Sequence, residues 1–218
     1  MTYLAHIAGD ENMIEAFRSG FDIHASTAAK VFGVSPDSVS GEMRSAAKAI
    51  NFGLVYGMGE FSLSQDLHIS LKEAKAYIDD YLGSYPNVKK YMKDTVDFAK
   101  EHGYVKTMFG RRRDIPELKS SNYQTRSFGE RAAMNTPVQG TAADIIKLAM
   151  INVSRRLKQE NLKSRLILQV HDELIVEAEK TEVDQVCRIL KTEMENAASL
   201  LVPLKVDMQT GHSWYDTK

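Results

Sequence analysis

The chain has 218 residues, of which 43% are apolar, so it can bury a substantial core and form one or two domains. Its net charge of −1 excludes a global basic field, so any nucleic-acid partner must be held by local clusters of charge. The one cysteine, Cys187, excludes an internal disulfide and fits a reducing cytosol. No apolar run approaches the length of a membrane span, and no signal peptide is recognisable.

Two short helices are predicted between residues 10 and 32. Each has an aspartate placed as its N-cap and a glycine placed as its stop, Asp10 with Gly20 and Asp22 with Gly33. His24 falls in the first turn of the second helix, beside the positive end of the helix dipole. That position suits either an ordinary surface histidine or a contact with an anion.

The next predicted helix begins at Ser35-Pro36 and runs to about residue 56. It carries a stripe of side chains spaced four residues apart, in the order Arg44, Lys48, Phe52 and Tyr56. Two cations one turn apart can hold a polyphosphate, and two rings beyond them can stack on a base. No acid lies within the stripe to neutralise the cations. The alternative is an amphipathic helix with the rings in the core and the cations reaching solvent.

Residues 61–102 follow a helical pattern without evident chemistry, broken at Pro86 and ended by Gly103. Residues 104–115 are predicted to form a hairpin with Gly110 at its turn. Residues 111–131 then carry six basic and three acidic side chains, a local charge of +3. Such a segment is often a solvated face, but it also suits a phosphate backbone.

Two helices are predicted over residues 122–134 and from about Pro137 to Leu157, separated at Thr136-Pro137. Three polar side chains recur every four residues across this region, Arg131, Asn135 and Gln139. Amides both donate and accept hydrogen bonds, which suits base edges in a groove, while arginine suits phosphate and minor-groove acceptors. The alternative is an ordinary polar surface.

Residues 165–178 are predicted to form a tight hairpin, with Leu166, Leu168 and Val170 on its buried side. Its turn carries the charged or titratable residues His171, Asp172 and Glu173 in place of glycine or asparagine. Carboxylate oxygens are the ligands that Mg²⁺ prefers, so a metal is one interpretation and a solvated turn is the other. An amphipathic helix over 181–200 and a short strand over 204–208 are predicted to follow.

Three separated motifs in this order, MRSAAKAINFGLVYGMG, MNTPVQGTAADIIKLAM and VHDELIVE, resemble the C-terminal part of the family A DNA polymerases, the family of bacterial DNA polymerase I. The likeness extends over nearly the whole chain. It implies an α+β fold with a helical fingers region over 10–102 and a palm portion over 103–218, the catalytic hairpin lying at 165–178. Residues 1–9 would be the remnant of the strand and helix of palm motif A, and the small antiparallel palm sheet, backed by helices, would lack its first strand.

The resemblance implies a role for each candidate residue. In the family, the residues that bind deoxynucleoside triphosphates (dNTPs) match His24, Arg44, Lys48, Phe52 and Tyr56. The residues that bind primer–template DNA match Arg131, Asn135, Gln139 and His171. Asp172 matches a metal-binding aspartate and Glu173 a lesser carboxylate beside it, and Lys48 counts with these two as a catalytic residue. The reaction is a two-metal nucleotidyl transfer with Mg²⁺.

This chain departs from the family pattern at its start. The second metal-binding aspartate of the family lies in a strand motif of the form DYSQIELR, which has no counterpart before LAHIAGDEN here. We therefore expect this chain to be part of a DNA polymerase for replication and repair, cytoplasmic and nucleoid-associated, without membrane attachment. We expect the chain to be weak or inactive alone, or to be completed in trans by the missing N-terminal segment. The alternatives are a noncatalytic DNA- and dNTP-binding fragment and a metal-dependent hydrolase built on Asp172 and Glu173.

Overall fold

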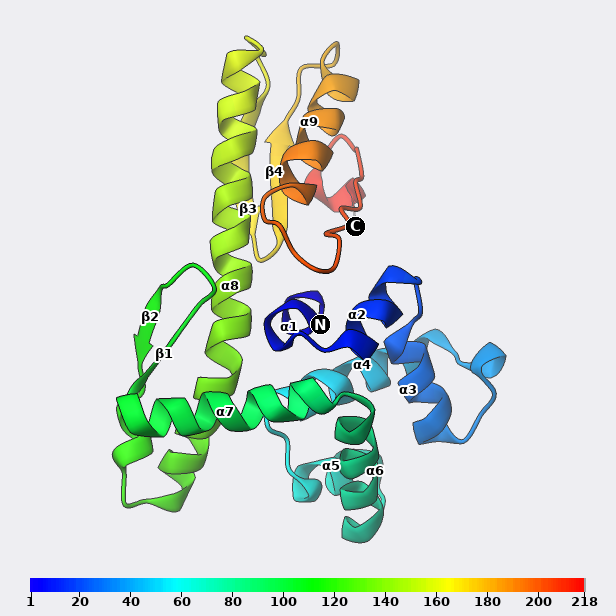
Figure 1. Ribbon diagram of the computed structural model, residues 1–218. Helices are drawn as coiled ribbons and strands as arrows, with labels where there is room; N and C mark the ends of the chain where they lie inside the picture. The colour runs from blue at the N-terminus through cyan, green and yellow to red at the C-terminus, as the bar shows by residue number, and fades with distance from the viewer. Residues whose placement is uncertain (218) are drawn as a thin grey trace. The chain divides into compact units, whose positions relative to one another are not determined.

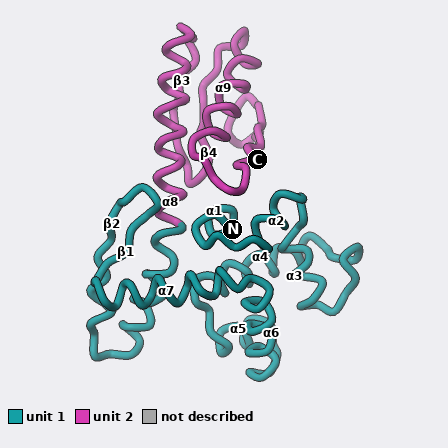
Figure 2. The backbone as a smooth tube through the Cα atoms, in the orientation of Figure 1, with its two compact units in different colours: residues 1–138 teal, residues 139–218 magenta. Residues whose placement is uncertain are grey.

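The computed structural model describes residues 1–217, which form an α+β structure dominated by helices (Figure 1). Its strands make two separate antiparallel pairs, β1–β2 and β3–β4. The chain divides into two compact units, residues 1–138 and 139–218 (Figure 2). The predicted fold class is confirmed. The finer division into residues 1–9, 10–102 and 103–218 follows function, not compactness, and stays a prediction.

The first unit opens with short helices, α1 (Thr2–Ala8), α2 (Glu11–Arg18), α3 (Ile23–Phe32), the 3-10 turn η1 (Pro36–Ser38) and α4 (Gly41–Val55). The predicted caps of α2 and α3 are confirmed: Asp10 accepts a hydrogen bond from the Met13 N–H, and Asp22 accepts from the His24 and Ala25 N–H groups. Helix α2 ends before Gly20, and α3 ends at Gly33 in the left-handed conformation.

The helix predicted from Ser35-Pro36 starts later than expected. Val39 and Ser40 are extended, so η1 stops at Ser38 and a new helix begins at Gly41. The hydroxyl of Ser40 accepts a hydrogen bond from the Met43 N–H and supplies the cap. A side-chain cap inside the expected helix therefore sets its true start.

The first unit continues with α5 (Glu60–Leu67), α6 (Leu71–Ser84) and α7 (Pro86–His102), as the pattern over 61–102 predicted. Helices α4, α5 and α6 share a core of buried side chains, Ile50, Leu54, Leu63, Ala74 and Tyr81. Asp10 has its second carboxylate oxygen 2.9 Å from the Asn87 N–H, so it also caps α7. One buried carboxylate therefore joins the starts of α2 and α7.

The predicted hairpin is confirmed as β1 (Tyr104–Lys106) paired with β2 (Arg112–Asp114), with Gly110 in the turn at a φ of 81°. Turn η2 (Pro116–Lys119) follows, and α8 (Tyr123–Gln159) comes next as one continuous helix. The prediction of two helices broken at Thr136-Pro137 is wrong. Pro137 removes only one backbone donor, the one that would bond the Ala133 carbonyl, so the helix passes through with the loss of one hydrogen bond.

The second unit contains the end of α8, the strands β3 (Arg165–Val170) and β4 (Glu173–Glu177), α9 (Val183–Glu195) and the 3-10 turn η3 (Trp214–Thr217). Val153 and Leu157 of α8 pack with Val186 and Ile189 of α9, and partly buried Leu174 and Val176 of β4 contact this core. The amphipathic helix predicted over 181–200 is therefore present but shorter. Residues 204–208 form no strand, because no other strand of the described residues pairs with them.

The β3–β4 hairpin differs from the predicted alternation in two ways. A register shift between Leu166 and Leu168 moves Leu168 off the buried side, and its side chain is 45% exposed as a result. The turn contains only His171 and Asp172, because Val170 pairs directly with Glu173, the first residue of β4. His171 has a φ of 50°, so a non-glycine residue takes the left-handed position of the turn.

Candidate functional site

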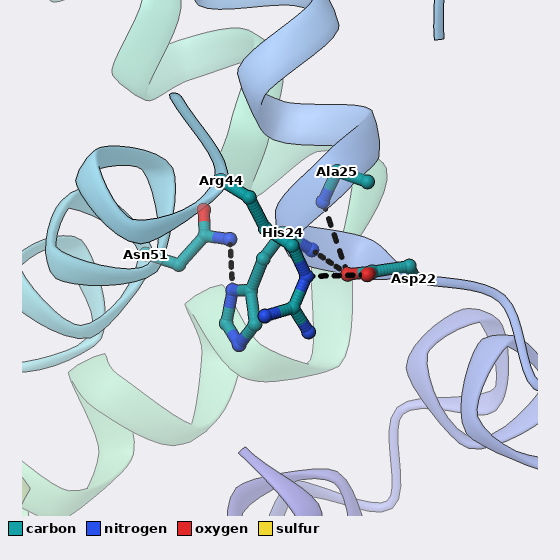
Figure 3. A network of polar contacts seen from close by, with 5 residues as sticks. All are labelled: Asp22, His24, Ala25, Arg44 and Asn51. Carbon is teal, nitrogen blue, oxygen red and sulfur yellow. Dashed lines mark hydrogen bonds and ion pairs between the residues drawn. The ribbon is translucent and has the colours of Figure 1, made fainter. Parts of the chain in front are cut away.

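Helices α3 and α4 lie against each other and hold most of the candidate nucleotide-binding residues. Their contact is polar at its centre, where the Thr27 hydroxyl donates to the Asn51 Oδ1 at 3.0 Å. Both side chains are buried, Asn51 completely. The Asn51 amide nitrogen lies 2.8 Å from Nδ1 of His24 (Figure 3). The core of the helix pair thus orients a histidine at its edge.

Arg44 lies in the first half of α4 and contacts the start of α3. Its Nε is 2.6 Å from Oδ2 of Asp22, the residue that caps α3 (Figure 3). Although burial alone would raise the pKa of Asp22, the hydrogen bond and charge of Arg44 and the Ala25 N–H hold that pKa below its usual value. The sequence stripe contains no acid, but the fold brings one to Arg44 from outside it.

Lys48 is exposed one turn further along α4 and makes no ion pair or hydrogen bond with the described residues. Burial lowers the pKa of His24, and the charges of Arg44, the Met1 amino group and Lys48 lower it further, against the opposing charge of Asp22. His24 is therefore neutral near pH 7 and stands in a positive field. This arrangement suits a bound polyanion.

Two rings continue the row beyond the cations. The ring centroids of His24 and Phe52 are 6.0 Å apart, and those of Phe52 and Tyr56 are also 6.0 Å apart. Both Phe52 and Tyr56 are half-buried, so each keeps part of its ring accessible. The structure therefore brings together all five candidate nucleotide-binding residues on α3 and α4.

The polar trio lies on α8, with Arg131 and Gln139 exposed and Asn135 half-buried. Arg131 donates to the Ser127 hydroxyl at 2.8 Å, and Oδ1 of Asn135 is a buried acceptor without a partner among the described residues. Gly57, just after α4, is packed so closely on α8 that a Cβ there would lie 3.2 Å from Cγ of Arg131. Within the first unit, the end of the α4 row is thus in contact with α8.

The basic segment after the first hairpin is partly neutralised. Arg112 pairs with Asp114 and lies over the Tyr104 ring, 3.9 Å from its centroid. Lys100 of α7 pairs with Glu130, and Arg113 donates to the Thr136 hydroxyl. These pairs order the segment, which lessens the significance of its charge count for phosphate binding.

The carboxylates of the second hairpin are exposed. Asp172 lies in the turn and Glu173 starts β4, and neither side-chain carboxylate has a hydrogen bond or ion pair with another described residue. The side-chain amide of Gln169 donates to the His171 carbonyl and braces the turn. Residues 1–217 contain no group of three metal-ligating side chains, so Asp172 can supply one ligand but these residues do not enclose a metal.

The family model described as DNA polymerase family A matches residues 1–216. The chain belongs to DNA polymerase family A. DNA polymerase I of Bacillus subtilis (strain 168) is 57% identical and that of Geobacillus stearothermophilus 55% identical, each over 99% of this chain. The solved POL domain of Pol1 from M. smegmatis, in complex with DNA primer-template and dNTP, covers the whole chain at 45% identity and a TM-score of 0.93.

Membership of family A accounts for the three motifs that carry the resemblance. The chain spans 24% of the length of the two DNA polymerase I relatives and 38% of the M. smegmatis chain. None of the helices in the described part of the chain is both long and apolar enough to cross a membrane. The sequence patterns did not single out Thr27 and Asn51, the buried polar pair behind His24. The one feature that could have indicated them is that both are polar residues on the apolar sides of their helices.

Proposed function

We propose that the protein carrying this chain is a DNA-directed DNA polymerase that transfers a nucleotide from a dNTP to a primer 3′-hydroxyl under template direction. The observation that carries the proposal is the row on α3 and α4, in which cations and a histidine are followed by two accessible rings. The cations and the histidine of this row can bind a triphosphate, and the two rings can stack on a base. Family membership supports the same reading.

Within this proposal, Arg44, Lys48 and His24 bind the triphosphate. Lys48 is the strongest candidate for a direct contact because its charge has no partner among the described residues. Phe52 lies beside the incoming sugar and base, and Tyr56 next to the template position. The half-burial of both rings supports these roles, since a stacking ring must be fixed on one face and open on the other.

The proposal assigns DNA contacts to Arg131, Asn135, Gln139 and His171. Arginine and amide side chains at successive turns of α8 match minor-groove acceptors and phosphates. Asn135 lies between Arg131 and Gln139 on the same side of α8, and its side chain is half-buried. His171 lies in the hairpin turn next to the carboxylates, where a primer end would be placed.

Asp172 is proposed as one metal ligand, with Glu173 as a secondary carboxylate. Their exposed oxygens fit Mg²⁺ as donors, but the set is incomplete within residues 1–217. When bound, Mg²⁺ would neutralise phosphate charge and favour the deprotonated 3′-hydroxyl. We accordingly expect these 218 residues alone to extend primers weakly or not at all, and an N-terminal polymerase segment added in trans to restore synthesis.

The proposal includes a role in DNA replication and repair in the bacterial cytoplasm. A noncatalytic fragment that binds DNA and dNTP is the second candidate, favoured by the incomplete metal-ligand set. The two differ in one respect. A split polymerase gains Mg²⁺-dependent synthesis when the N-terminal segment is added, and a binding fragment does not.

Titration of dNTP onto the purified protein with primer–template DNA tests the nucleotide site. Lys48→Ala should raise the Kd for dNTP roughly tenfold or more, because one hydrogen bond to a charged group contributes about 1.5–3 kcal/mol. Lys75→Ala is the matched control, since Lys75 is exposed on α6 away from the α3–α4 row. An unchanged Kd in Lys48→Ala, with equal DNA binding, would contradict the assignment.

A further inference from the structure

Behind His24 runs a path of hydrogen-bonded side chains that starts at Thr27 on α3. Thr27 donates to Oδ1 of Asn51, and the Asn51 amide nitrogen faces Nδ1 of His24. Thr27 is 5% exposed and Asn51 is fully buried. Because water does not reach the centre of the path, its members must satisfy one another.

The direction of the hydrogen bonds follows from the supply of protons. The Thr27 hydroxyl has one proton, which goes to Oδ1 of Asn51. With its oxygen occupied, Asn51 turns its NH₂ group to His24, and Nδ1 of the ring must be the acceptor.

The opposite direction would need Asn51 rotated, so that its NH₂ group faces Thr27 and its oxygen faces His24. The Thr27 hydroxyl, which is 5% exposed, would then lose the acceptor that it has at Oδ1 of Asn51, and the imidazole would have to carry its proton on Nδ1.

We propose that Asn51 and Thr27 are positioning residues that hold His24 as the neutral tautomer with its proton on Nε2, so that this nitrogen donates to the triphosphate of the incoming nucleotide. The second half of the inference rests on the proposed function. Figure 3 shows the ring nitrogen opposite the Asn51 contact pointing away from the amide. No described residue makes a hydrogen bond with that nitrogen.

The tautomer matters because of the charges around the ring. The groups that face His24 are Asp22 at the start of α3, Arg44 and Lys48 on α4, and the amino group of Met1. Burial and the two cations Arg44 and Lys48 keep the imidazole neutral near pH 7, against the opposing charge of Asp22. A neutral ring can donate to a phosphate oxygen only from a protonated Nε2, since the other tautomer would direct a lone pair at the anion.

Nitrogen NMR of the purified protein with labelled histidine tests the first half without nucleotide. The His24 signals are assigned by their loss in His24→Gln, and wild type should show protonated Nε2 and bare Nδ1. Thr27→Val removes the hydroxyl at constant shape and should give a mixture of tautomers, while Thr27→Ser should retain the wild-type pattern. Asn51→Asp should raise the pKa of His24 above its ordinary value, because a carboxylate favours the imidazolium.

A His24 ring protonated on Nδ1 in wild type would overturn the inference. So would a Thr27→Val protein that keeps the wild-type tautomer. Thermal unfolding of each variant separates misfolding from an effect on the tautomer. Thr27→Ser distinguishes loss of the hydroxyl from loss of packing, because serine keeps the hydroxyl and valine keeps the shape. If Thr27 acted only through packing, Thr27→Val would leave the histidine signals as in wild type.

Nucleotide titration tests the second half. Thr27→Val should raise the Kd for dNTP about threefold to tenfold, the effect of weakening one hydrogen bond to a charged group, and Thr27→Ser should restore it. Ser26→Ala, on the same helix, is the control. If His24→Gln leaves the Kd unchanged, the nucleotide role of His24 is wrong, whatever the NMR shows. If His24→Gln weakens binding but Thr27→Val does not, the positioning role is wrong and the proposed function stands.

Discussion

Arg44 Nε donates a 2.6 Å hydrogen bond to Oδ2 of Asp22, whose other oxygen caps α3. The carboxylate therefore has two functions, one for the helix and one for the cation. Both side chains are between 40% and 49% exposed, so the ion pair itself adds at most about 1 kcal/mol to stability. Its main effect is to hold the guanidinium in place and to compete with any anion that binds there.

The first prediction concerns that competition. Asp22→Asn keeps an oxygen for the cap but removes the negative charge, so it should cost less than about 1 kcal/mol of stability and tighten dNTP binding. Asp22→Ala also loses the cap and should cost about 0.5–2 kcal/mol. Urea unfolding and dNTP titration measure the two effects. Weaker binding in Asp22→Asn would show that Asp22 orients Arg44 more than it competes for it.

The second prediction concerns pH. The folded-state pKa of His24 is lowered, so the unfolded chain takes up a proton first and stability falls as pH drops through the ordinary histidine range. The folded-state pKa of Asp22 is also lowered. Its contribution to the free energy of unfolding is therefore present above the ordinary aspartate pKa and is lost as pH falls through the folded-state pKa. The free energy of unfolding across pH should therefore decline in two windows. His24→Gln should flatten the upper window and Asp22→Asn the lower one.

The same measurement can contradict this account. If His24→Gln leaves the slope between pH 5 and 7 unchanged, another group must carry the decline, such as the amino group of Met1, whose pKa burial lowers to about 6. His212→Gln is a suitable control, because His212 is exposed in the C-terminal segment.

The third prediction concerns Asp10, which caps two helices with its two oxygens. Oδ1 accepts from the Met13 N–H, and Oδ2 accepts from the N–H groups of Asn87 and Val88. At an ordinary cap asparagine replaces aspartate well, but here its NH₂ group would face the start of one helix. Asp10→Asn should therefore cost nearly as much as Asp10→Ala, about 2–4 kcal/mol. A thermal unfolding midpoint like that of wild type in Asp10→Asn would refute the double cap.

The fourth prediction concerns the contact between Gly57 and α8. Gly57 has a φ of 83°, and a Cβ there would lie 2.5 Å from Cε of Met134 and 3.2 Å from Cγ of Arg131. Gly57→Ala should cost about 1–3 kcal/mol and, by displacing Arg131, weaken primer–template binding. Gly83→Ala in α6 meets open space and should stabilise by about 0.4–1 kcal/mol, which makes it the matched control. Equal stability of the two variants would contradict the close packing.

Local features of the fold were predictable because their causes are local. The caps Asp10 and Asp22, the stop at Gly33 and the hairpin turn at Gly110 all depend on a few neighbouring residues, and the structure confirms them. Errors arose where a neighbour in space overrode the pattern. Pro137 did not break α8, and the register shift in β3 turned Leu168 outward. Neither effect is visible in the periodicity of side chains.

The sequence by itself determined the family and the row of cations and rings, because both rest on residue types at fixed spacings along one chain. Only the tertiary structure decided that Asp22 reaches Arg44 and that a buried path from Thr27 through Asn51 ends at His24. Those partners lie up to 27 residues apart and meet because α3 and α4 pack against each other, so no spacing rule could have paired them.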